Sequence, residues 1–237
     1  MLSTIKSYIQ RIESKDPTLT RVVINYSKLS LAELKAITTK LVNSKVTELD
    51  LSYTNIDCEG IKVLAELLEK NTLTYLALNG NQLGDEELKI LATAVKRNNS
   101  LTGFSILANR ASREGKRSLA EAFEGHKNLI SYSGFGEFDI GRRAAKNRKN
   151  TLIVVDALLQ ESTTINSTQL EKLTSGSFAA IATILKKERA FNNEQITNLF
   201  KKKGITKLIE KLQETDVIIE EGIEKERLLN KLSLIHI

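Results

Sequence analysis

One stretch of sequence decides the fold of this chain: LTYLALNGNQL, at residues 73–83. Similar stretches begin 27 residues before it, at 46–56, and 28 residues after it, at 101–111. More divergent copies occupy 19–29 and 129–139. Five copies at this regular spacing predict a repeat architecture in which each unit packs on its neighbours.

Aliphatic residues recur in three columns of these copies. The L-x-L spacing places two apolar side chains on one face of a short strand, and one strand alone cannot bury that face. The third column contains Ile24, Leu51, Leu78 and Ile106, and Gly134 interrupts it. Stacking of the strands therefore predicts a parallel sheet with a continuous core.

The segments between the copies have helical periodicity. Within residues 85–95, for example, Leu88, Leu91 and Val95 fall on one stripe. Side chains suited to helix N-caps precede three of these segments, at Ser30, Asp57 and Ser112. The predicted unit is strand, turn and helix, with strands lining a concave face and helices on the convex face.

The repeated unit resembles the leucine-rich repeat of the ribonuclease-inhibitor type, over roughly half of the chain. The resemblance implies an α/β solenoid that presents a surface to another macromolecule. Asn81 and Asn109 match the turn asparagine of the pattern, whereas Glu137 departs from it. We therefore expect the fifth unit to be degenerate and to begin a C-terminal cap.

Three regions follow from this pattern. Residues 1–18 are expected to form a helical cap, in which Leu2, Ile5, Ile9 and Ile12 share a face and Pro17 stops the helix. A membrane or targeting helix is the alternative interpretation. Residues 19–139 form the five repeats, and residues 140–237 are expected to be an all-helical region packed on the last repeat. No apolar run has the length of a secretory signal or a membrane span.

The sequence offers little for catalysis. The only cysteine, Cys58, excludes an intramolecular disulfide and is typical of a reducing compartment. The two histidines, His126 and His236, are far apart, and no phosphate-binding glycine loop occurs. Residues 140–237 contain no cysteine, which excludes the ubiquitin-ligase chemistry of some bacterial leucine-rich-repeat effectors. We expect a non-enzyme with no cofactor and no metal.

The positions between the aliphatic columns are expected to face the concave side. Tyrosine and arginine are favoured in binding hot spots. The candidate partner-binding residues are Arg21, Asn25, Tyr26, Glu48, Asp50, Tyr53, Tyr75, Asn79, Leu107 and Phe135. Tyr26 is expected beside Tyr53, and Arg21 opposite Glu48. Mutual packing without a partner is the alternative for these pairs. Leu107 and Phe135 are expected to be exposed.

Charge is unevenly distributed. Residues 1–139 carry 18 basic and 17 acidic side chains, whereas residues 140–237 carry 17 and 12. Basic runs in the second region suggest an alternative function, an adaptor whose C-terminal helices contact nucleic acid or anionic membrane. A regulator of a GTPase is a further alternative, although the sequence singles out no residue for that chemistry.

The C-terminal residues combine an acidic block with an apolar end. Glu220, Glu221 and Glu224 match the pattern E-E-x-x-E, and Leu234 and Ile235 lie near the terminus. This combination resembles the translocation signal of type IV-secreted effectors from intracellular bacteria. It is also compatible with an ordinary charged helix. The resemblance implies an effector that is cytosolic in the producing cell, is secreted into a host cytoplasm, and binds a host protein through its concave face and helical cap.

Overall fold

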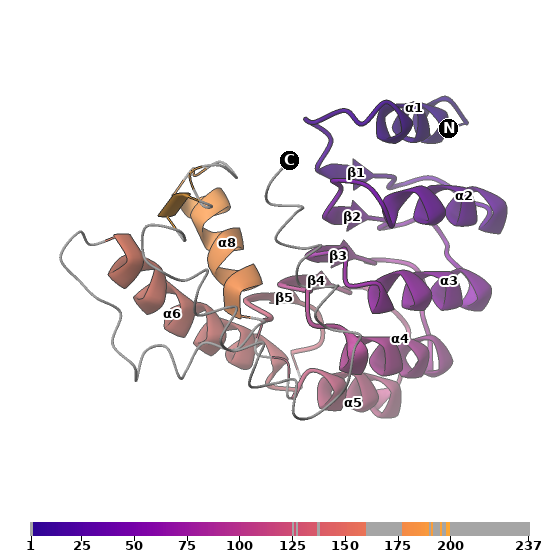
Figure 1. Cartoon of the computed structure of the whole chain (residues 1–237). Coiled ribbons are helices and arrows are strands. Elements are labelled where there is room, and N and C mark those ends of the chain that lie inside the picture. The colour runs from indigo at the N-terminus through magenta and orange to yellow at the C-terminus, as the bar shows by residue number, and fades with distance from the viewer. Residues whose placement is uncertain are drawn as a thin grey trace, which may run out of the picture. The chain divides into compact units, whose positions relative to one another are not determined.

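The five sequence copies form the five strands of one parallel sheet, in the order β1-β2-β3-β4-β5 (Figure 1). The strands are β1 (Arg21–Val23), β2 (Glu48–Asp50), β3 (Tyr75–Ala77), β4 (Gly103–Ser105) and β5 (Ser131–Ser133). Equivalent repeat positions pair across the sheet, because Leu49 of β2 is in register with Leu76 of β3, which is in register with Phe104 of β4. The predicted parallel stacking of the repeats is confirmed.

The computed structural model describes residues 2–124, 126, 128–136, 138–159, 177–189, 191, 195, 198 and 199. The chain forms two compact units, residues 1–148 and 149–237. The helix α6 (Ile140–Leu159) begins in the first unit and ends in the second, which also contains α8 (Ser177–Glu188). None of the described helices combines the length and apolar character that crossing a bilayer requires.

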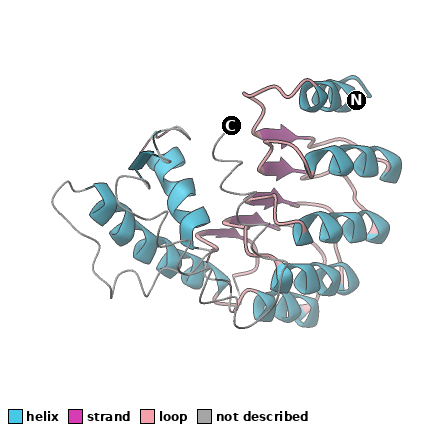
Figure 2. Cartoon of the chain, in the orientation of Figure 1, coloured by secondary structure: helices cyan, strands magenta, loops and turns pink. Residues whose placement is uncertain are grey.

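Helices follow the strands on one side of the sheet (Figure 2). They are α2 (Leu31–Leu41), α3 (Cys58–Glu69), α4 (Asp85–Arg97) and α5 (Arg113–Ala122). The predicted N-caps are confirmed, since the side chains of Ser30, Asp57 and Ser112 each accept a hydrogen bond from a backbone N–H of the first helical turn. The α/β solenoid predicted from the repeat pattern is therefore present, with a helix after each of the first four strands.

The core lies between the sheet and these helices. Leu51, Leu78 and Ile106 of the third column are 0% exposed. The first two columns are also buried through the fourth repeat; they are Leu19, Val46, Leu73 and Leu101, and Val22, Leu49, Leu76 and Phe104. The helical stripe meets them from the other side, because Leu88, Leu91 and Val95 of α4 are also buried. Each repeat thus contributes apolar surface that its neighbours cover.

Turn asparagines connect successive repeats. Oδ1 of Asn81 accepts hydrogen bonds from the backbone N–H groups of Thr54 (3.0 Å) and Ile56 (3.3 Å), and its Nδ2 donates to the carbonyl of Leu51 (2.8 Å). Asn109 makes the equivalent bonds one repeat later, accepting from Asn81 N–H and Leu83 N–H. The asparagine amides thus provide hydrogen-bond partners for buried backbone groups that lie outside the strand pairing.

The helix α1 (Leu2–Glu13) packs on the first repeat and contributes Ile5 to the core. The hydroxyl of Tyr8 accepts a hydrogen bond from the N–H of Val23 (3.3 Å), which satisfies a donor on the edge strand β1. The helix ends before the expected stop at Pro17. Lys15 adopts a left-handed conformation (φ 54°), and Asp16 N–H donates to the Arg11 carbonyl. This C-terminal cap ends the helix, so the prediction that Pro17 ends it is wrong.

The fifth repeat departs from the pattern for a steric reason. The Tyr132 hydroxyl lies where a Cβ at Gly134 would be, close also to Ile106, so the tyrosine ring fills the space of the missing third-column side chain. The same hydroxyl accepts a hydrogen bond from the N–H of Phe135 (3.1 Å). Burial raises the pKa of Tyr132 to about 12. Ile140 and Ala144 of α6 then extend the core of the repeats. Packing of the remaining C-terminal residues on the last repeat stays a prediction.

Candidate functional site

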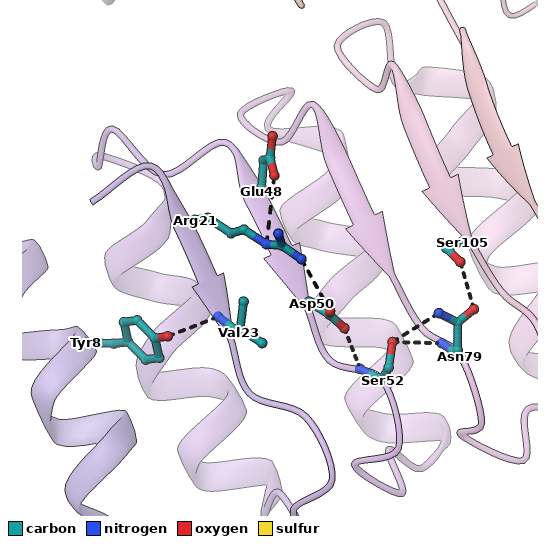
Figure 3. Close-up of polar contacts among 8 residues, drawn as sticks. All are labelled: Tyr8, Arg21, Val23, Glu48, Asp50, Ser52, Asn79 and Ser105. Atoms are coloured by element: carbon teal, nitrogen blue, oxygen red, sulfur yellow. Dashed lines mark hydrogen bonds and ion pairs between the residues drawn. The ribbon is translucent and has the colours of Figure 1, made fainter. Parts of the chain in front are cut away.

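The predicted binding residues that belong to the first three strands lie on one face of the sheet. Arg21, Glu48 and Tyr75 occupy the same register position on β1, β2 and β3. Asp50 lies two residues after Glu48, on the same side of the strand β2. The structure therefore brings the predicted charged residues together with Tyr75 on neighbouring strands. Figure 3 shows the three charged residues.

Arg21 bridges two carboxylates of the neighbouring strand. Its Nε lies 3.9 Å from Glu48 Oε2, and one terminal nitrogen lies 3.6 Å from Asp50 Oδ2 (Figure 3). The expected Arg21–Glu48 pair is confirmed, and Asp50 is an additional partner. Both distances exceed the 2.7–2.9 Å of a strong charge-assisted hydrogen bond, and the Arg21 side chain is 52% exposed. The cluster is a loose, solvated ion pair with little stabilising effect on the fold.

A chain of hydrogen bonds continues from this cluster across the sheet. Oδ1 of Asp50 accepts from Ser52 N–H (3.1 Å), and Ser52 Oγ accepts from the side chain of Asn79 (3.2 Å). Oδ1 of Asn79 accepts from Ser105 Oγ (2.8 Å) and from Leu107 N–H (2.7 Å). Figure 3 shows the chain from Asp50 to Ser105. The amide of Asn79 connects the second, third and fourth repeats, which is a structural use that the sequence reasoning missed.

Tyr26 and Tyr53 form a parallel stack beside the strands. Their ring centroids are 4.7 Å apart and the ring planes differ by 6°. The predicted adjacency of these two tyrosines is confirmed. Both residues have left-handed backbone conformations, with φ of 51° and 57°. Tyr26 is nevertheless 75% exposed and Tyr53 44% exposed, so the stack presents aromatic surface to solvent.

Two glycines make room for the tyrosines of the preceding repeat. The Tyr53 ring occupies the space that a Cβ at Gly80 would fill, 27 residues later in the chain. Similarly, a Cβ at Gly103 would lie 2.6 Å from Cδ2 of Tyr75, 28 residues before it. These spacings equal the repeat period. The pairing of a tyrosine with a glycine one repeat later was therefore a signal in the sequence that our prediction did not use.

Tyr75 is half-buried and points along the array towards the fourth repeat. Its hydroxyl is hydrogen-bonded to the Ser105 side chain. Burial raises the pKa of Tyr75, and the nearby Asp50 carboxylate raises it further, while Arg21 opposes both. Tyr75 is thus electrostatically coupled to the Arg21 ion cluster.

The remaining predicted residues differ in exposure. Leu107 is exposed, as expected, and Asn25 is half-buried. The expected exposure of Phe135 is wrong, because its ring packs against the core and the Lys116 ammonium of α5 lies 5.2 Å from the ring centroid. The backbone N–H of Phe135 donates a hydrogen bond to the Tyr132 hydroxyl. The residues of the predicted secretion signal, Glu220, Glu221, Glu224, Leu234 and Ile235, lie outside the described residues.

Cys58 and His126 are the candidate nucleophile and ligand residues that lie in the described part of the chain. Burial raises the pKa of Cys58, and a contact between its thiol and Glu86 Oε1 (3.5 Å) acts in the same direction, which makes the thiol less reactive. His126 is buried beside Phe123. Among the described residues, no three of the His, Cys, Asp and Glu side chains are grouped closely enough to hold a metal ion.

Comparisons with known proteins agree on the fold. A family model described as "Leucine Rich repeat" matches residues 42–65 and 69–89. The solved structure of leiomodin-1 actin-binding site 2 has a TM-score of 0.57 and 19% identity, over 66% of this chain and 98% of that chain. The tropomodulin C-terminal domain of Caenorhabditis elegans has a TM-score of 0.55 and 21% identity, over 66% and 99%. No curated protein matches this sequence.

These similarities and the observed topology define the class of the protein: it contains a leucine-rich-repeat solenoid, and such repeats are typically protein-binding modules. At 19% and 21% identity, the likeness to the two solved structures is one of fold. The ribonuclease-inhibitor type and the resemblance to bacterial effectors stay predictions.

Proposed function

We propose that this protein is a non-enzymatic interaction module that binds a protein partner through the concave face of its first three repeats. The observation that carries the proposal is the Tyr26–Tyr53 stack, since both rings remain exposed although they pack on each other. Exposed aromatic side chains next to charged residues are typical of binding hot spots. The Arg21 ion cluster lies on the same repeats.

The size of the face limits how it binds. Five strands spaced about 4.8 Å apart span only roughly 20 Å. Specific protein–protein interfaces bury about 800 Å² on each partner. The proposed partner therefore contacts the turns beside the strands or the C-terminal region as well, or it is a short peptide segment that binds weakly.

Affinity capture with a double variant, Tyr26→Ala and Tyr53→Ala, tests the proposal. Alanine is suitable at both positions because Ala108 holds the equivalent position of the fourth repeat at φ 55°. A control variant replaces three exposed convex-face residues, Lys35, Glu66 and Lys96, by alanine. We expect the double variant to lose partners that the wild type and the control retain. Equal capture by all three proteins would exclude the tyrosine stack as the contact.

The partner that we propose is a host protein, reached by type IV secretion from a bacterial cytosol. The acidic motif at Glu220, Glu221 and Glu224 and the apolar residues Leu234 and Ile235 support this route. A reporter fused to the N-terminus measures translocation into host cells. We expect Ala substitution of the three glutamates to reduce translocation without changing the amount of protein in the producing cell. Unchanged translocation would show that the three glutamates are not needed for secretion.

Leiomodin-1 presents an actin-binding site on the same fold. Actin is therefore a defined protein to include in the binding assay. Its binding is not expected from the residues of the concave face, because the likeness is limited to the fold. Pelleting with filaments, and titration of monomers, measures whether this chain binds it.

A second candidate function is supported by the charge of the C-terminal region. Residues 140–237 carry 17 basic and 12 acidic side chains, which favours an adaptor that contacts nucleic acid or anionic membrane. Such contacts weaken steeply as salt concentration rises, because phosphate binding releases counterions. Binding that survives high salt and depends on Tyr26 and Tyr53 would separate the first function from this one.

A further inference from the structure

The turns that follow the first four strands are held in register by backbone hydrogen bonds. The N–H groups of Tyr26, Tyr53 and Gly80 each donate to the carbonyl one residue before the equivalent position of the next repeat, over distances of 2.7 to 3.1 Å. Ala108 holds that position in the fourth repeat. These four residues therefore follow one another along the array, from the first repeat to the fourth.

Exposed apolar side chains are concentrated along this line. Among the described residues, the exposed large hydrophobic side chains are Tyr26 (75%), Tyr53 (44%) and Leu107 (47%). The Tyr53 ring extends over Gly80, whose N–H is bonded to the Leu107 carbonyl, so the fourth repeat follows directly after the tyrosine stack. Ala108, which comes after Leu107, is exposed as well. We call Tyr26, Tyr53, Leu107 and Ala108 the rim row.

The fold does not need tyrosines in the rim row. Tyr26 (φ 51°) and Tyr53 (φ 57°) hold the position that Gly80 (φ 63°) and Ala108 (φ 55°) hold in the next two repeats. A left-handed backbone is easiest for glycine, and strain of this kind concentrates at functional sites. Smaller residues serve the fold at this position, which indicates that the two rings have a use beyond folding.

Cationic side chains flank the rim row at both ends. Lys28 of the first repeat and Arg110 of the fourth hold the same turn position, two residues after the line of the row, and both are exposed. In the two repeats between them, this position contains neutral amides, because Nε2 of Gln82 donates to Oδ1 of Asn55 (3.1 Å). The row thus has an apolar centre with one positive charge near each end.

The nearby carboxylates are already used by the fold. One acidic side chain, Asp57, occurs in the turns, and it caps α3 by accepting a hydrogen bond from Gly60 N–H (2.8 Å). On the strand side of the row, Glu48 and Asp50 face the Arg21 guanidinium. Within the part of the chain that the structure describes, the two cations at the ends of the row therefore have no carboxylate partner. The turns comprise residues 26–30, 53–57, 80–84 and 108–112.

We propose that the rim row binds a short extended segment of a protein partner in which acidic residues flank an apolar centre. The apolar side chains of the segment cover the tyrosine stack and Leu107. Its carboxylates pair with Lys28 at one end and with Arg110 at the other. The inference rests on the proposed protein-binding function and specifies the chemistry of the partner.

The length of the row sets the spacing of the acidic residues. Three strand spacings, or roughly 14 Å, separate the first repeat from the fourth. Four residues of an extended chain span roughly 13 Å. Two acidic residues four positions apart, with apolar residues between them, therefore match the separation of the turns that carry Lys28 and Arg110.

A single-stranded nucleic acid also combines planar groups with negative charge. Its backbone carries a phosphate at every nucleotide, so it requires cations along its whole path. The middle of this row instead has the amides of Asn55 and Gln82. The carboxylates of Glu48 and Asp50 on the adjoining strand repel a phosphate backbone. A peptide segment with charges only at its ends fits the row better.

The test uses the full chain and four peptides. The reference is acetyl-Glu-Phe-Ser-Leu-Glu-amide; the others replace both glutamates by glutamine, both glutamates by lysine, or phenylalanine and leucine by serine. The chain has five tyrosines, so ring signals of a tyrosine-labelled protein are assigned by single substitution and followed during titration. We expect the reference peptide to shift the Tyr26 and Tyr53 signals with a dissociation constant of roughly 1 mM. The glutamine peptide should bind about threefold more weakly, the lysine peptide more weakly still, and the serine peptide should leave the signals unchanged.

Variants of the protein identify the groups that bind. We expect Lys28→Gln and Arg110→Gln each to weaken binding of the reference peptide by about twofold, and to leave binding of the glutamine peptide unchanged. Leu107→Ala should weaken binding of both peptides by about threefold, because it removes apolar contact area. Lys35→Gln is the matched control, since it removes the same charge from an exposed position on α2 and is expected to change nothing.

The inference is overturned if the glutamine, lysine or serine peptide binds as well as the reference, if no peptide shifts the signals, or if Lys35→Gln weakens binding as much as Lys28→Gln does. A thymidine hexanucleotide that shifts the same signals at lower concentration than the reference peptide would overturn it in favour of nucleic acid.

The proposed function fails separately from this inference. If capture of a partner depends on Tyr26 and Tyr53 but not on Lys28 and Arg110, and the reference peptide does not compete, the protein-binding function stands and the acidic segment is wrong. If the reference peptide binds as expected but capture is insensitive to the two tyrosines, the rim row binds acidic segments and the protein-binding function is wrong.

Discussion

The ring of Tyr53 lies over Gly80, in the space that a side chain at residue 80 would occupy. Gly80 also has a left-handed backbone, with φ of 63°. This relationship fixes one side of the exposed tyrosine stack, because the third repeat accepts the ring of the second only where no Cβ is present.

We expect Gly80→Ala to destabilise the protein by about 1–2 kcal/mol, from the left-handed backbone and the displaced ring. Tyr53→Ala in the same chain removes the steric conflict. The double variant should then be more stable than the sum of the two single changes predicts, with a coupling of at least about 0.5 kcal/mol. Urea unfolding of the four proteins measures this cycle, and strict additivity would mean that the ring does not depend on Gly80.

Gly103→Ala tests the second tyrosine–glycine pair. The new Cβ would lie 2.6 Å from Tyr75 Cδ2, so we expect the ring to move and the protein to lose about 1 kcal/mol. Gly136→Ala is the control, because a Cβ there meets nothing within 4 Å. The Tyr75 ring signals should shift only in the first variant. Shifts of equal size in both variants would show that the Tyr75 signals do not report a direct contact between the ring and residue 103.

The sequence predicted the parts of the structure that depend on spacing. The repeat period placed Leu49, Leu76 and Phe104 in register, and the period also placed Tyr26 beside Tyr53 and Arg21 opposite Glu48. These contacts follow from the geometry of stacked strands, in which equivalent residues of neighbouring repeats must be adjacent.

The predictions that were wrong concern residues whose positions depend on individual contacts, which the repeat spacing of the sequence does not determine. Phe135 was expected on the exposed face, but the hydroxyl of Tyr132 binds its N–H and the ring packs inwards. The end of α1 depends on the left-handed conformation of Lys15, which has no characteristic residue type in the sequence. Such details are determined by local competition between side chains for the same space or hydrogen bond.

Asn81→Ala tests the connection between repeats. The change removes the side-chain acceptor of Thr54 N–H and Ile56 N–H in a buried turn. It also removes one of two donors to the Leu51 carbonyl, which keeps its hydrogen bond from the Thr54 hydroxyl. We expect a loss of about 2–4 kcal/mol, because buried backbone groups without partners are costly. Asn43→Ala replaces an exposed asparagine and should change the free energy of unfolding by less than about 0.5 kcal/mol. Chemical unfolding compares the two, and similar losses would argue against a specific role of the turn amide.

His126 gives the protein a stability that depends on pH. Burial lowers its pKa from 6.5 to about 4, against a smaller opposing effect of the Asn98 backbone. The unfolded chain therefore binds a proton below pH 6.5 that the folded protein does not bind until the pH approaches 4. As the pH falls through this window, unfolding becomes more favourable, by about 3 kcal/mol at its lower end.

Urea unfolding between about pH 7.5 and about pH 4.5 measures this effect, because the ordinary histidine pKa lies within this range. Asp16, whose pKa is lowered to about 2 by hydrogen bonds from the Thr18 and Arg11 side chains, loses its contribution only at lower pH, because the carboxylate is stabilised above its unfolded pKa of 3.8. We expect His126→Phe, which keeps an aromatic ring beside Phe123, to flatten the profile above pH 4.5. A variant that retains the wild-type slope would assign the pH dependence to other groups, and a wild type with no slope would mean that His126 reaches solvent in the folded state.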